Sequence, residues 1–159
     1  MASTITAATL TVTHTESISL NGSAQGATNS FTVASVNEIS KRIVTITTTE
    51  AEILKFHTSE IDAGRYITGD VRYMRFTNKD DTNFITLTFT NEDGDEVAIK
   101  LDAGQSFIWN ADNNGGVVDV LNATQDADAA SDTALGDLTN IQADANTASC
   151  DLEMFIASV

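Results

Sequence analysis

Few side chains in this 159-residue sequence have both the type and the spacing needed for catalysis or metal binding. His14 and His57 each lie beside threonine rather than within a ligand cluster, so only the fold could bring them together. The single cysteine, Cys150, alternates with Leu152 and Met154 on a predicted core face, where a thiol behaves as a small apolar group. We therefore expect surface histidines and a buried, inert cysteine.

An aspartate-rich segment offers one hint of a metal site. Asp126 and Asp128, followed by Asp132 and Asp137, resemble part of a calcium loop, but the central glycine and the bidentate glutamate of such a loop are missing. There is also no glycine-rich phosphate loop and no nucleophile-elbow serine. The sequence predicts no catalytic residue, no cofactor and no metal, and hence a protein that is not an enzyme.

Charge excludes further classes of function. Asp and Glu number 23 against 8 Lys and Arg, which gives a formal net charge of −15 and argues against nucleic-acid binding. Every base lies between residues 41 and 100, whereas residues 101–159 carry ten acids and no base. That acidic block is either solvated surface or a means of steering toward a basic partner. No run approaches about 18 apolar residues and no secretory signal is recognisable, so we expect no membrane association.

The elements that would position any site are strands. Threonine makes up roughly a seventh of the chain, proline is absent, and threonine mostly alternates with large apolar residues. In the segment 84–90, Ile85, Leu87 and Phe89 point one way and the threonines the other, which is the period of a half-buried strand. An Asp93-Gly94 turn follows, and then alternation resumes, which predicts a β-hairpin.

Further strands are predicted along the whole chain, at 9–15 paired with 17–20, and at 30–36, 42–49, 71–77, 106–109, 117–121 and 149–158. The middle of the chain is predicted to form an antiparallel meander. Residues 50–61 fit either a short helix or a strand with Leu54 and Phe56 inward, and the neighbouring strands favour the strand. The Ala- and Asp-rich residues 123–148 are predicted to form a long loop with at most one short helix.

These elements predict an all-β fold in one domain, residues 1–159. About ten short strands with turn signals every 8–12 residues indicate an antiparallel two-sheet β-sandwich, with jelly-roll and immunoglobulin-like topologies both open. Residues 1–20 are predicted to form a strand-forming assembly arm. The predicted core consists of Met74, Phe76, Ile85, Leu87, Phe89, Val97, Ile99, Leu101, Phe107, Trp109, Val118, Leu152, Met154 and Ile156.

Residues 65–110 resemble a segment of small virion proteins from tailed bacteriophages. The resemblance lies in a strand of the type RY-x-R-x-TN, an Asp-Thr-Asn turn and an L-x-A-G-x-S-F turn. The matching residues are Arg72, Tyr73, Arg75, Thr77, Asn78, Asp81, Thr82, Asn83, Leu101, Ala103, Gly104, Ser106 and Phe107. This resemblance implies a β-sandwich subunit of a phage head or tail, with no catalytic residues to carry over.

The leading functional hypothesis is therefore a capsid decoration or cement protein of the virion, assembled in the host cytoplasm. Its expected partners are the major capsid protein and copies of itself in a homotrimer. A tail, adaptor or fibre-base subunit is the alternative. A carbohydrate-binding module, with Trp109, Tyr66 and Tyr73 as stacking platforms, is a third hypothesis from a different class.

Overall fold

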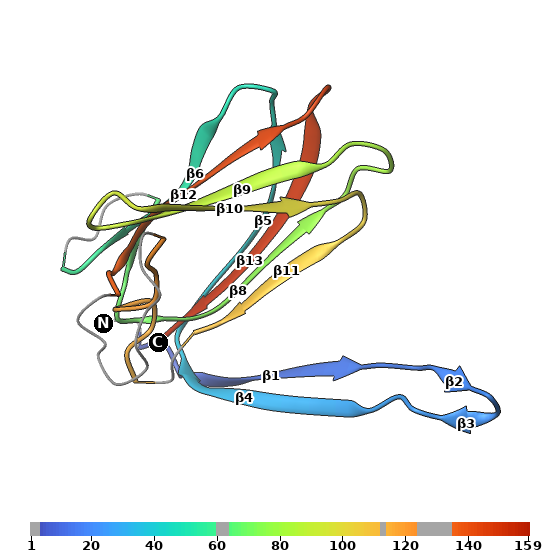
Figure 1. Ribbon diagram of the computed structural model, residues 1–159. Helices are drawn as coiled ribbons and strands as arrows, with labels where there is room; N and C mark the ends of the chain where they lie inside the picture. Colours follow the sequence, from blue (N-terminus) through green and yellow to red (C-terminus); the bar gives the residue numbers. More distant parts are fainter. Residues whose placement is uncertain (1–3, 60–63, 112–113, 124–134) are drawn as a thin grey trace.

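The computed structural model describes residues 4–59, 64–111, 114–123 and 135–159, and in these ranges it contains strands and no helix. Two sheets pack face to face, and a separate two-stranded hairpin projects from one end of the sandwich (Figure 1). The four-stranded sheet has the order β11 (Ser106–Asn110), β8 (Val71–Asn78), β13 (Cys150–Ser158), β5 (Glu38–Ile46). The five-stranded sheet has the order β10 (Glu96–Leu101), β9 (Ile85–Asn91), β12 (Leu138–Ala145), β6 (Ala51–His57), β7 (Arg65–Ile67).

The strand pairing is that of a jelly roll. Four antiparallel pairs are nested within one another along the chain: β5 with β13, β6 with β12, β8 with β11, and β9 with β10. This nesting produces two Greek keys and decides between the two topologies that the sequence left open. The predicted meander is wrong, because β8 and β11 lie in one sheet while the β9–β10 hairpin between them lies in the other.

The sandwich core confirms the predicted strand faces. Ile85, Leu87 and Phe89 are at most 1 % exposed, and Cys150 lies on the buried face of β13 as expected. Ile99, Phe107 and Trp109 are partly buried and pack against this core. Val97 is partly buried as well, but it lines the open edge of the core. Two predicted core residues are wrong: Val97 and Val118 are only partly buried and belong to neither apolar cluster, whereas Val117, beside Val118, is fully buried.

The predicted strand at 117–121 is also wrong. Gly116 has a φ of +67°, and a Cβ there would lie 2.2 Å from the Thr68 carbonyl oxygen, so the chain turns close against that backbone. Asp119 has a positive φ of 50°, which interrupts an extended strand. In this segment only an isolated bridge joins Leu121 to Gly136.

The loop predicted at 123–148 is wrong over Leu138–Ala145, which form strand β12. Leu138, Ile141, Ala143 and Ala145 are all buried between β9 and β6. The register shifts between Leu138 and Asn140, so the buried side chains are three residues apart there and the period of two is hidden. Residues 124–134 of the predicted loop lie outside the described residues. The strand predicted at 50–61 is confirmed over Ala51–His57 as β6, with Leu54 and Phe56 inward, and residues 60–61 lie outside the described residues.

The N-terminal segment forms a long hairpin. The predicted pairing of 9–15 with 17–20 is wrong, because the first strand of the hairpin pairs with β4 instead. Strand β1 (Ala8–Thr15) pairs with β4 (Thr28–Val36), and the short strands β2 (Ser19–Leu20) and β3 (Ser23–Ala24) continue the ribbon to its tip. Asn21 and Gly22 both have positive φ, as a two-residue hairpin turn requires. The element that projects thus extends to Val36, whereas the predicted arm ended at residue 20.

Candidate functional site

The structure keeps the sequence-predicted reactive groups apart. His14 lies on β1 and stacks on Phe31 with ring centroids 6.0 Å apart. His57 ends β6 in the five-stranded sheet and accepts a hydrogen bond from the Ser59 N–H. Cys150 is 1 % exposed, and burial raises the pKa of its thiol. A thiol of this kind is a poor nucleophile, because the thiolate is the reactive form.

The described residues contain no group of three or more His, Cys, Asp or Glu side chains arranged to hold a metal ion. Asp137, the last member of the calcium-like segment, uses its Oδ1 to accept the Asp119 N–H at 3.0 Å. Asp126, Asp128 and Asp132 lie outside the described residues. The one described carboxylate of this segment therefore joins the chain at Asp119 to the residue that precedes β12.

The three aromatic residues considered for sugar stacking lie in different surroundings. Trp109 packs on Phe89 in the core, with ring centroids 5.3 Å apart. Tyr66 lies beside Phe56 on β7 and β6, whereas Tyr73 is buried under the hairpin. They do not form a shared platform for a sugar ring.

Four of the residues quoted for the phage-protein resemblance meet around one buried asparagine, namely Asn78 itself, Asn83, Leu101 and Gly104. Asn78 is fully buried, and its Nδ2 donates to the carbonyl oxygens of Asn83 (2.8 Å) and Leu101 (3.1 Å). The backbone N–H of Gly104 donates to the Asn78 carbonyl at 3.1 Å. Asn78 thus joins the β8–β9 connection to the β10–β11 connection. These motif residues build one end of the sandwich.

Asx-type turns lie at both ends of strand β9. Asp80 Oδ1 accepts the N–H groups of Thr82 and Asn83, and these bonds lower the pKa of Asp80. Asn91 is buried, and its Oδ1 accepts the N–H groups of Asp93 and Asp95.

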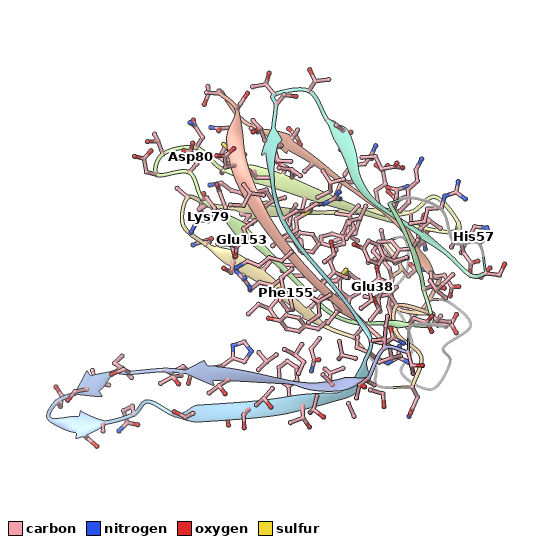
Figure 2. All side chains as sticks on the ribbon, turned by 180° about the vertical axis from the view of Figure 1, so that it is seen from behind. Glu38, His57, Lys79, Asp80, Glu153 and Phe155 are labelled. Carbon is pink, nitrogen blue, oxygen red and sulfur yellow. The ribbon has the colours of Figure 1, made fainter. Side chains whose placement is uncertain are left out.

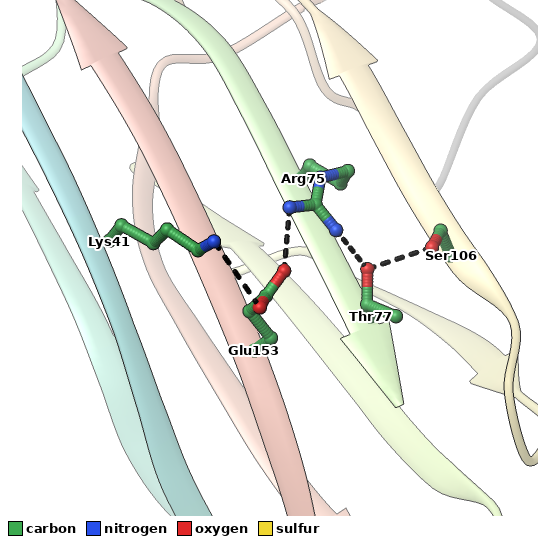
Figure 3. Close-up of polar contacts among 5 residues, drawn as sticks. All are labelled: Lys41, Arg75, Thr77, Ser106 and Glu153. Carbon is green, nitrogen blue, oxygen red and sulfur yellow. Dashed lines mark hydrogen bonds and ion pairs between the residues drawn. The ribbon is translucent and has the colours of Figure 1, made fainter. Parts of the chain in front are cut away.

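The solvent-facing side of the four-stranded sheet carries a polar network drawn from all four strands (Figure 3). Arg75 donates to Glu153 at 2.6 Å, and Lys41 lies 3.6 Å from the other Glu153 oxygen. Arg75 also donates to the Thr77 hydroxyl, which lies 2.8 Å from that of Ser106. We call the side that bears these residues the outer face.

Glu153 is the centre of this network. The Arg75 hydrogen bond, and then the positive charges of Arg75, Lys41 and Lys79, hold the pKa of Glu153 below its ordinary value. Three bases therefore gather on the outer face around two acids, Glu153 and Asp151, in a chain whose overall charge is strongly negative. Figure 2 shows Phe155, Glu153 and Lys79 following one another along this side, away from the hairpin.

The hairpin is seated on the outer face through a second, small apolar cluster. Val33 and Val36 of β4 are buried against Tyr73 and Ala157. Phe31 lies 6.1 Å from the Tyr73 ring, and Tyr73 lies 5.9 Å from Phe155 edge to face. Sequence analysis missed this seat, although the Asn21-Gly22 pair is a strong hairpin signal.

Beyond its seat, the hairpin has no contact that buries it. All residues from Thr15 to Ser30 are exposed, including Ile18 and Leu20 near the tip. On the outer face itself, Ile39 and Ile43 of β5 are exposed large apolar residues. The hairpin tip and the outer side of β5 thus both present large apolar side chains to solvent.

No protein-family model matches this chain, and no curated protein matches it either. Within the ranges that the structure describes, no helix is long and apolar enough to cross a bilayer.

Proposed function

We propose that this chain is a non-enzymatic structural protein of a phage virion, of the capsid decoration or cement type. The observation that carries the proposal is the hairpin, which projects from the jelly roll and exposes Ile18 and Leu20 near its tip. Isolated two-stranded ribbons are marginally stable in water. A long one with exposed apolar residues is best explained by a partner that covers it.

Other features support an assembly role over catalysis. The candidate nucleophile Cys150 is buried, and the described residues contain no group of three or more side chains arranged to hold a metal ion. Of the residues quoted for the resemblance to small phage virion proteins, Asn78, Asn83 and Leu101 have a structural role at one end of the sandwich. A jelly roll of this size also stands without disulfides, which suits assembly in a reducing host cytoplasm.

The proposed partners are the major capsid protein and further copies of this chain in a homotrimer. A chain with net charge −15 associates faster with a basic acceptor surface, and its attraction decreases as salt is added. The affinity itself should depend mainly on apolar contacts and strand pairing.

The test is binding of the purified protein to shells that lack it. A cement protein should bind at a stoichiometry that matches the capsid lattice and raise the temperature at which the shells rupture, because it binds only the intact assembly. Binding confined to one vertex or to isolated tails would favour the tail or adaptor alternative. Tight binding to an oligosaccharide without affinity for shells would contradict both virion roles.

A further inference from the structure

Two pairs of exposed apolar side chains lie on different parts of this chain. Ile18 and Leu20, near the hairpin tip, are 58 % and 61 % exposed. Ile39 and Ile43 lie on the outer face of β5 with one outward-facing residue, Lys41, between them, and they are 56 % and 59 % exposed. Covering such side chains removes apolar surface from water, which favours association.

A single copy does not bring the two pairs together. The hairpin seat involves Tyr73 of β8, Ile108 of β11, and Phe155 and Ala157 of β13, but no residue of β5. From that seat the ribbon runs outward, and its tip lies well beyond the sandwich (Figure 1). The tip and the β5 surface are therefore both open in the same copy.

Charge makes the two surfaces complementary. Lys41 lies between Ile39 and Ile43 on β5 and is 59 % exposed, and Arg75 and Lys79 add positive charge nearby. The hairpin contains no base, and its one acid, Glu16, lies two residues before Ile18. In a chain of net charge −15, most contacts between copies are repulsive, so this part of the surface, where three bases outnumber the acids Asp151 and Glu153, is a favourable place for a copy to approach.

The backbone of β5 offers additional contacts. This strand is the edge of the four-stranded sheet, with β13 on one side and no strand paired on the other among the described residues. Edge strands present N–H and C=O groups that an incoming extended segment can pair with.

We propose that the hairpin tip of one copy docks on the β5 surface of a second copy, with Ile18 and Leu20 against Ile39 and Ile43. This inference rests on the proposed assembly function and names the partner of the hairpin as another copy of the same chain. Because tip and β5 are different surfaces, the contact is heterologous, and repeating it closes a ring when the rotation permits. The expected homotrimer is one such ring.

The first test is disulfide trapping between two single variants, Ile18→Cys and Ile43→Cys, purified separately. Oxidation of the mixture should yield a covalent dimer that contains one chain of each variant, and neither variant alone should yield it. Ile5→Cys is the matched control, since Ile5 is 69 % exposed but belongs to neither surface. Equal trapping of Ile5→Cys with Ile43→Cys, or trapping of Ile18→Cys with itself, would overturn the proposed contact.

The second test measures self-association of the full chain by light scattering over a concentration series. The double variant Ile18→Asp/Leu20→Asp should weaken association by at least about tenfold, while Ile5→Asp leaves it unchanged. At concentrations where the wild type is monomeric, thermal unfolding should be unaltered in both variants, because the substituted side chains are exposed and association no longer stabilises the wild type. A wild-type protein that stays monomeric at every concentration, or a double variant that associates normally, would overturn the inference.

These outcomes separate the inference from the proposed function. Wild-type protein that binds shells without self-association would contradict only the contact between copies. Self-association that depends on Ile18 and Leu20, without binding to any shell or tail, would leave the contact intact and contradict the virion role.

Discussion

At the scale of single residues, Asn78 ties together two connections that are more than twenty residues apart in the sequence. Its amide satisfies the Asn83 and Leu101 carbonyls, and its Oδ1 accepts the Asp80 N–H at 3.0 Å. Replacing a buried group of this kind leaves its partners without hydrogen bonds, which costs about 1–3 kcal/mol for each unsatisfied group.

Asn78→Ala should therefore lower the free energy of unfolding by at least about 1–3 kcal/mol. Asn110→Ala, at an exposed position of β11, should change it by less than about 0.5 kcal/mol. Urea denaturation of the two variants and the wild type measures both values. Equal losses of stability at the two positions would contradict the role of the Asn78 hydrogen bonds in joining the two connections.

The lowered pKa of Glu153 predicts how the stability of the protein changes with pH. Because its pKa in the folded protein lies below the ordinary value of 4.5, the unfolded chain binds more protons than the folded one near that pH. The stability contributed by this group is complete above the unfolded pKa and is lost as the pH falls through the lower folded pKa. Asp80 shows a shift of the same sign, so the comparison needs a Glu153 variant.

Glu153→Gln should be less stable than the wild type near neutral pH, and the difference should shrink as the pH falls below about 4.5. Denaturant unfolding at a series of pH values measures this difference. A gap between the two proteins that stays constant with pH would show that the Arg75–Glu153 contact does not depend on the charge of the carboxylate.

At the scale of elements, the hairpin is a unit attached to the jelly roll by one small apolar cluster. Its buried residues belong to the cluster around Tyr73 and Ala157, whereas the main core contains no buried residue before Ile46. Elements held by few buried contacts open with lower free energy than the global unfolding.

Phe31→Ala should therefore loosen the hairpin without unfolding the sandwich. Amide hydrogen exchange should become faster in β1 and β4, while β8 and β13 remain protected. Thr32→Ala is the matched control, because Thr32 is the next residue and lies on the exposed side of β4. Loss of protection throughout both sheets would show that the hairpin is part of the cooperative core.

At the scale of the whole molecule, the jelly roll should fold without its hairpin. A chain of residues 37–159 retains all eight nested strands and the entire main core. Removing only residues 1–20 would instead leave β4 without its β1 partner. The boundary at residue 37 is therefore the one that the structure favours.

Residues 37–159 should unfold in one cooperative transition, at a lower temperature than the full chain because Tyr73 and Phe155 lose their cover. Thermal unfolding followed by circular dichroism measures this. The truncated protein should also bind an apolar dye more strongly. A truncated chain with no cooperative transition would place the hairpin within the folding unit.

The sequence by itself determined the class of fold and most strand faces. Side chains alternate every two residues in any strand, so the spacing of Ile85, Leu87 and Phe89 predicts a buried face without knowledge of the partner strand. The same reasoning found β6 and β13. It failed at β12, where a bulge changes the spacing between Leu138 and Ile141.

Only the tertiary structure decided how these strands are nested and which outer surfaces they create. The outer-face network joins Lys41, Arg75, Ser106 and Glu153 from four strands, and no local pattern connects them. The hairpin seat likewise depends on Tyr73 and Phe155, which are far from Phe31 in sequence. The alternation of buried and exposed side chains is a property of one strand. A surface shared by several strands depends on long-range strand pairing, and the entropic cost and energetic gain of that pairing involve the whole chain.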